Sequence, residues 1–296
     1  NVTAHTGTGR IARLLLRPMS LFKSMDSTGT VSLRELFEGK QQIEGMSRLS
    51  IEEIAFLTCR GGWPATVGQE KETALQMATN YVEAVINMDV QRVDEIDKSP
   101  DRVRMLLRSL ARNIATTASI QTIKADIEAH ETGISDKTIS SYLNALRRIF
   151  VVEDLPAWQP SIRSKTAIRT SSKRHFVDPS IATAVMRANP DSILHDFETF
   201  GFLFEALCTR DMRIYAQAND GDLFHYRDKT ELEADMIVRL RNGKWAAIEV
   251  KLGSKQIENA AANLLRLQKI CPDWYVYRIK NPCSISGGIR QIPPTD

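Results

Sequence analysis

The sequence has few of the residues that bind soft metals or cross-link small folds. It contains 4 cysteines and 5 histidines in 296 residues. No two of the cysteines form a Cys-x-x-Cys pair; they are Cys59, Cys208, Cys271 and Cys283. We therefore expect no zinc site. Free thiols in a reducing cytoplasm are the simplest interpretation, and they predict a cytoplasmic protein.

Long apolar runs are also missing. No run approaches the roughly 18 residues that a membrane-spanning helix needs, so we expect no membrane partner. The first residues, from Asn1 onward, lack the basic and apolar parts of a signal peptide. The absence of an initial methionine leads us to expect a piece of a longer protein. A net charge of +3 is too small to indicate a partner by itself, so the distribution of charge matters more.

Two short apolar runs near the end of the chain carry acids and a lysine at their ends. The runs are 236–240 and 245–251, and the Asn-Gly step between them favours a type I′ hairpin turn. Asp235 precedes the first run, and Glu249 and Lys251 end the second. A hairpin brings these ends together and puts Glu249 and Lys251 on one face. Carboxylates suit Mg²⁺, and a nearby lysine can orient a water or offset charge on a phosphate.

This pattern resembles the PD-(D/E)xK superfamily of restriction-endonuclease-like nucleases. The resemblance implies that Asp235 and Glu249 bind a metal and act in catalysis, with Lys251 as the catalytic lysine. It also implies that Glu205, on the preceding helix, is a further metal ligand. Ala234 stands where the superfamily usually has proline. A solvated hairpin with charged ends, or a nuclease-like fold that has lost its chemistry, is the alternative interpretation.

The middle of the chain predicts three helices and a small wing. Apolar residues recur at helical spacing over 99–117, 119–129 and 137–150. Short strands are expected at 151–155 and 175–177. Three helices followed by a two-stranded wing is the order of a winged helix-turn-helix, in which the third helix would be the recognition helix.

Basic and polar side chains suited to phosphate and base contacts follow this order. On the third helix they are Lys137, Ser140, Ser141, Asn144, Arg147 and Arg148, and in the wing they are Arg163, Lys165, Arg169, Lys173 and Arg174. Residues 155–177 contain no acid, as in patches that bind a polyanion such as DNA. The alternative is a protein–protein module whose basic loop is merely solvated.

The remaining elements are expected on both sides of these two motifs. Before the three helices we expect a strand at 11–16, a helix opened by a capping box at 50–53, and a long helix at 70–87. After the wing we expect helices at 179–189, 191–208 and 256–268, and strands at 212–216, 223–226 and 274–277. The fold class is therefore mixed α+β: a helical region with a winged helix-turn-helix, then a restriction-endonuclease-like α/β domain.

Several phrases occur along the chain in a fixed order. They are Gly9-Arg10, Leu16-Arg-Pro-Met-Ser20, Gly61-Gly-Trp-Pro64, Asp89, Thr138-Ile-Ser-Ser-Tyr-Leu143, Phe176-Val-Asp-Pro-Ser-Ile-Ala182 and the hairpin. Together they resemble the AAA+-type ATP-binding proteins of bacteria and archaea that carry a C-terminal domain of unknown function. In that family a P-loop ATPase precedes a winged helix and a nuclease-like domain. The ATP-binding motifs would then lie before residue 1, and Arg10 or Arg13 could lie near the nucleotide.

The resemblance divides the chain into four parts. It implies a remnant of the ATPase core at 1–40, a helical lid or linker at 41–98, a winged helix-turn-helix at 99–180 and a PD-(D/E)xK nuclease-like domain at 181–296. The expected function is the DNA-associated C-terminal portion of a P-loop AAA+-type ATPase, with Mg²⁺ as candidate cofactor of a nuclease-like site. The alternative is a non-catalytic DNA- or protein-binding module that regulates the ATPase. ATP turnover would need the missing domain, which is itself an expected partner, and a homo-oligomer is a candidate assembly.

Overall fold

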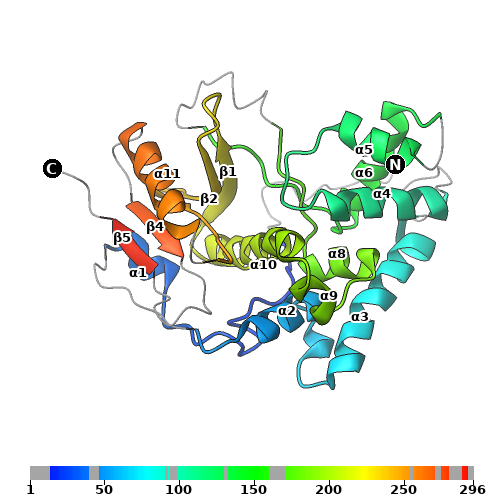
Figure 1. Ribbon diagram of the computed structural model, residues 1–296, viewed down its shortest axis with the longest axis horizontal. Coiled ribbons are helices and arrows are strands. Elements are labelled where there is room, and N and C mark those ends of the chain that lie inside the picture. Colours follow the sequence, from blue (N-terminus) through cyan, green and yellow to red (C-terminus); the bar gives the residue numbers. More distant parts are fainter. Residues whose placement is uncertain are drawn as a thin grey trace, which may run out of the picture.

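The computed structural model describes residues 14–39, 47–90, 93, 99–129, 133–159, 171–253, 256–270, 275–279 and 289–292. The chain is a mixed α+β protein, as expected. Helices gather on one side of the molecule and a sheet lies on the other, with one long helix between them (Figure 1).

The first part of the chain is helical. It forms α1 (Leu33–Phe37), α2 (Ile51–Arg60), a short 3-10 turn (Pro64–Thr66) and α3 (Lys71–Ala84), which continues into a π-helical turn at Val85–Asp89. The predicted capping box opens α2: the Ser50 hydroxyl accepts from Glu53 N at 3.2 Å, and Ser50 N donates to the Glu53 carboxylate at 2.6 Å. The strand predicted at 11–16 is absent from its described part, residues 14–16.

Three helices follow, as the spacing predicted. They are α4 (Pro100–Arg112), α5 (Ile120–Glu128) and α6 (Asp136–Arg148), and Ser135 caps α6 by accepting from Thr138 N at 3.0 Å. The two segments expected as a wing pair through isolated antiparallel bridges, Val152 with Phe176 and Leu155 with Lys173. The wing strands are therefore shorter than predicted, and they pair through isolated bridges rather than a continuous ladder.

The long helix between the two halves differs from the prediction. The chain forms α8 (Pro179–Met186), α9 (Pro190–Leu194) and α10 (Phe197–Ala218). The strand predicted at 212–216 is wrong, because these residues continue α10. The helix places Met212 and Ala216 on one buried face, four residues apart.

The second half is a sheet built around the predicted hairpin. Its strands are β1 (Gly221–Arg227), β2 (Glu233–Leu240), β3 (Trp245–Ile248), β4 (Tyr275–Ile279) and β5 (Ile289–Ile292), in that spatial order. Neighbours are antiparallel except β3 and β4, which are parallel and joined through α11 (Ile257–Ile270). From α10 onward the order is helix, three strands, helix, two strands, so the predicted order of helix, three strands, helix, strand is followed by one further strand, β5.

The two faces of the sheet are covered by different helices. Met236, Val238 and Ile248 belong to the same buried cluster as Phe200 and Leu203 of α10. Ile237, Trp245 and Ala247 belong to a second cluster with Leu264 and Leu267 of α11. This division follows the period of two along each strand, which sends alternate side chains to opposite faces.

The hairpin turn is of a different type from the one predicted. Gly243 has a φ of 90°, whereas a type I′ turn would need a positive φ at Asn242 as well. Gly243 N donates to Leu240 O at 3.0 Å, and the Asn242 side chain accepts from Lys244 N at 3.0 Å. Asn-Gly therefore supports the hairpin through a single left-handed glycine and an Asn side-chain contact.

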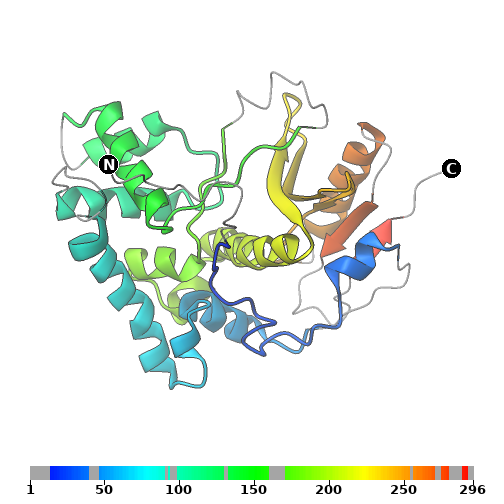
Figure 2. The same ribbon diagram turned by 180° about the vertical axis from the view of Figure 1, so that it is seen from behind.

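The helical half and the sheet share one core. A continuous cluster of buried apolar residues runs from Leu36 to Val250. Residues 14–39 cross from α10 to the sheet (dark blue in Figure 2), where Lys244 Nζ donates to Phe37 O at 2.7 Å. The division into four parts remains a prediction, and the packing holds the described parts together. Within the described residues, no helix combines the length and hydropathy that crossing a bilayer requires.

Candidate functional site

The structure brings the predicted acids and lysine together at one end of the hairpin. Asp235 lies in β2, directly before Met236, which pairs with Ile248 at the end of β3. Glu249 and Lys251 follow that strand end. Lys251 Nζ lies 3.1 Å from Asp235 Oδ2 and 2.6 Å from Glu249 Oε2. Asp235 Oδ2 also accepts from Val250 N at 2.8 Å.

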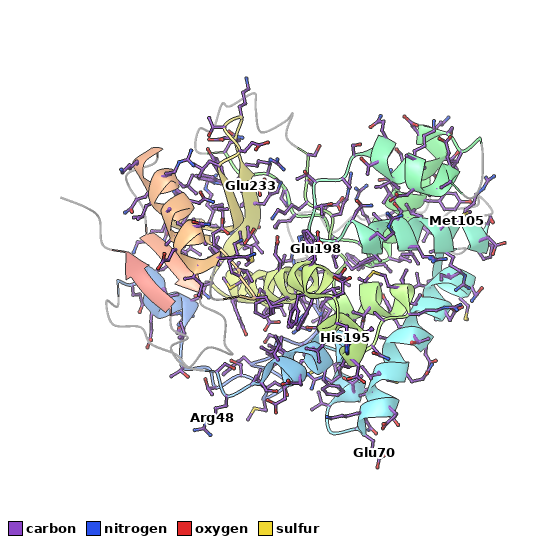
Figure 3. The ribbon with its side chains drawn as sticks, in the orientation of Figure 1. Arg48, Glu70, Met105, His195, Glu198 and Glu233 are labelled. Atoms are coloured by element: carbon purple, nitrogen blue, oxygen red, sulfur yellow. The ribbon has the colours of Figure 1, made fainter. Side chains whose placement is uncertain are left out.

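Glu205 reaches the same place from α10, as the resemblance implied. It is 8% exposed, and Asp235 and Glu249 are 6% and 3% exposed. Glu205 and Glu249 therefore both lie near Asp235, where α10 packs against the sheet. Glu233, at the start of β2, also lines the nearby cavity and is labelled in Figure 3.

A second lysine enters this cluster. Lys173 Nζ lies 2.7 Å from Glu205 Oε1 and 3.4 Å from Asp235 Oδ1. This contact could not be anticipated from local sequence patterns, because Lys173 is 32 residues from Glu205 and 62 from Asp235. The acid cluster is defined from here on as Lys173, Glu205, Asp235, Glu249 and Lys251.

This placement corrects the prediction for two of the wing cations. Lys173 and Arg174 are 7% and 8% exposed. Arg174 donates to Asp154 Oδ2 at 2.9 Å and to Ala118 O at 3.0 Å. Their prediction as DNA contacts is wrong, because both are buried and engaged with the protein itself.

The pKa values in the acid cluster follow from burial and from the neighbouring charges. Burial, together with the Asp235 charge, raises the pKa of Glu205 to about 7 and that of Glu249 to about 8. Burial also works against ionisation of Asp235, but the ammonium groups of Lys173 and Lys251 outweigh it and lower its pKa. Asp235 is therefore the ionised centre of the cluster, and Glu249 holds its proton near neutral pH.

A cavity of about 370 Å³ lies against the outer side of this cluster. Its lining is mainly acidic on the sheet side and amide-rich on the α11 side. The residues are Glu231, Glu233, Asp235, Glu249, Lys251, Gln256, Asn259, Ala260 and Asn263. Such a lining suits a cation or a hydrogen-bonding ligand rather than a bare phosphate.

The carboxylates as arranged do not fit a magnesium ion. Mg²⁺ needs oxygens directed at one point in near-octahedral geometry. Both oxygens of Asp235 are instead engaged by ammonium and amide donors. Among the residues that the structure describes, no three His, Cys, Asp or Glu side chains gather in a way that could hold a metal ion.

The predicted recognition helix keeps its polar face outward. Lys137, Asn144 and Arg148 are exposed, and Ser140 and Ser141 are half-buried. Arg147 is half-buried and paired with Asp154. Five of the predicted contacts lie outside the described residues: Arg10, Arg13, Arg163, Lys165 and Arg169.

A larger cavity, of about 760 Å³, was not anticipated from the sequence. It lies between the segment at 15–18, the end of α3 and the end of α6. Trp63 and Tyr81 line it with their rings 4.5 Å apart, and Arg17 and Glu153, which also line it, form an ion pair. Trp63 and Arg17 had been noted only as parts of the Gly61-Gly-Trp-Pro64 and Leu16-Arg-Pro-Met-Ser20 phrases.

Comparison with protein families gives two adjacent matches. Residues 51–192 match a domain of unknown function, DUF8612, and residues 200–295 match another, DUF4143. The second is a domain found at the C-terminus of AAA-ATPase-associated proteins, consistent with the resemblance above. The first match ends inside α9 and the second begins inside α10. Neither the curated proteins nor the solved structures give a match.

Proposed function

We propose that this chain is the DNA-binding, non-catalytic C-terminal portion of a prokaryotic, cytoplasmic P-loop AAA+-type ATPase. The ATPase domain would be its partner within the same protein, and ATP would bind only there. The match of residues 200–295 to a domain of AAA-ATPase-associated proteins supports this placement.

The exposed face of α6 is the observation that supports the proposed binding of DNA. Lys137, Asn144 and Arg148 are exposed along one side of the helix, at spacings of seven and four residues. The opposite side, with Ile139 and Leu143, is buried in the core. A helix held rigidly in this way can present a cation at each end of its face to a DNA backbone, with an amide between them.

Binding of a labelled duplex, followed by fluorescence anisotropy over a range of salt concentrations, tests this proposal. The variant Lys137→Glu/Arg148→Glu should bind at least about tenfold more weakly, with a salt dependence smaller by about two counterions. Lys229→Glu/Arg241→Glu is the matched control, because both of its residues are exposed on the sheet side and the change in net charge is the same.

Equal losses in the two double variants would mean that only net charge matters and would remove α6 as the binding face. Absence of DNA binding by the unmodified protein would favour the protein–protein interpretation of the same helix.

Mg²⁺-dependent cleavage of a phosphodiester is the second candidate function. The convergence of Glu205, Asp235 and Glu249 with Lys251 favours it, since this set matches the nuclease pattern residue by residue. The engagement of both Asp235 oxygens by ammonium and amide donors argues against this function.

Calorimetric titration of Mg²⁺ and Mn²⁺ into the unmodified protein, with Asp235→Asn as the control, separates the two candidate functions. Metal binding that the Asn variant loses would support the nuclease.

A further inference from the structure

Lys173 contacts two of the three acids that the nuclease pattern assigns to a metal. Its ammonium group bridges Glu205 Oε1 and Asp235 Oδ1, at 2.7 and 3.4 Å. The side chain is 9% exposed, and the two carboxylates it contacts are exposed by about the same small fraction. One positive charge therefore lies between two acids in a largely buried site.

The backbone around Lys173 is fixed from the helical half of the molecule. Lys173 and Leu155 exchange both backbone hydrogen bonds at 2.9 Å. The next residue, Arg174, donates through its backbone to Thr116 O at 2.7 Å and accepts from Ala115 N at 2.8 Å. The lysine is thus anchored beside α4 and α6, while its side chain reaches across to α10 and β2.

The contact joins the two parts of the chain that match different families. Lys173 lies within residues 51–192, whereas Glu205 and Asp235 lie within 200–295. A nuclease-like domain with its own metal would not need a cation from the preceding domain. The acid cluster is therefore complete only when both domains are present and docked.

We propose that Lys173 is a resident cation that replaces the divalent metal and latches the helical half onto the sheet. This inference goes beyond the DNA-binding function proposed above and does not depend on it. Removing the ammonium group would leave Glu205 and Asp235 facing an unfilled space, with one oxygen of each released. A divalent cation is the ligand that two such carboxylates attract.

Substitution of Lys173 should therefore create metal binding where the unmodified protein has none. We would titrate Mn²⁺ into the unmodified chain, Lys173→Met and Lys173→Met/Asp235→Asn by calorimetry, and record thermal unfolding with and without Mn²⁺. Lys137→Met is the matched control, because it removes an exposed lysine.

We expect Lys173→Met to bind Mn²⁺ at least about tenfold more tightly than the unmodified chain and to unfold at a higher temperature when Mn²⁺ is present. The double variant and the Lys137 control should show neither effect. If the Met variant does not fold, Lys173→Gln replaces it, since an amide can still donate to Glu205.

Two results would overturn the proposal. One is Mn²⁺ binding by the unmodified chain with the affinity of the variant, which would mean that the lysine yields to a metal and would favour the nuclease. The other is the lack of any Mn²⁺ effect on a folded Lys173 variant, Met or Gln, which would mean that a metal cannot take the place of this cation.

Discussion

The two charged regions of this molecule place their charges in opposite surroundings. On α6, Lys137 and Arg148 point to solvent. In the acid cluster the charges are buried or partly buried and contact one another at 2.6 to 3.4 Å. Exposed charges contribute little to stability, whereas buried ones are committed to the fold. Each region therefore predicts a different response to mutation.

The largest expected effect comes from the centre of the acid cluster. Asp235→Ala should lower the free energy of unfolding by about 3–5 kcal/mol, because it leaves the Lys173 ammonium buried without its second partner. Urea unfolding followed by circular dichroism measures this loss. Asp222→Ala, an exposed aspartate of the same sheet, should change stability by less than about 0.5 kcal/mol. Similar losses in both variants would contradict the contrast between buried and exposed charge.

The pH dependence of stability is a second way to distinguish the buried charges of the acid cluster from the exposed charges of α6. Glu249 has a folded-state pKa of about 8, raised from the ordinary value of 4.5 mainly by burial. The folded protein therefore holds a proton here that the unfolded chain has released, and this contribution is lost as the pH rises from about 5 to 8. Relative to the unmodified chain, Glu249→Gln should gain on the order of 3 kcal/mol over that range. Parallel stability curves for the two proteins would show that Glu249 is ionised throughout.

Local sequence signals were enough to predict the hairpin and the convergence of its ends. Alternating apolar residues and the Asn-Gly step act over a few positions, so Asp235, Glu249 and Lys251 could be placed together from the sequence alone. The contact with Lys173 could not be predicted, because it depends on how α10 and the wing segment dock. The cation was therefore interpreted as part of a solvent-facing patch.

The incorrect strand prediction at 212–216 also arose because long-range contacts cannot be predicted from local sequence patterns. Met212, Ile214 and Ala216 alternate with polar residues and favoured a strand. Two arginines of this part of α10 are buried in ion pairs: Arg210 contacts Asp178 at 3.0 Å, and Arg213 contacts Glu153 at 2.8 Å. Periodicity assumes that charge points outward, so it fails where distant partners neutralise the charge in the core.

A smaller loss of stability is expected at the start of α6. Ser135→Ala removes the side chain that accepts from Thr138 N at 3.0 Å and should cost about 1 kcal/mol. Ser140→Ala, within the same helix, should cost less than half as much, because alanine favours the helical backbone. Thermal unfolding of the two variants gives the comparison. An equal loss would mean that the cap does not hold the N-terminus of α6.

The smallest effect on stability is expected at Lys137, where the effect on DNA binding should be clear. Lys137→Ala removes an exposed ammonium and should change the free energy of unfolding by less than about 0.5 kcal/mol. The same change should weaken duplex binding and reduce its salt dependence by about one counterion, because one phosphate contact is lost. Urea unfolding and anisotropy on the same preparation measure both quantities. A loss of stability without a loss of affinity would place Lys137 with the buried charges and leave the α6 face without a ligand.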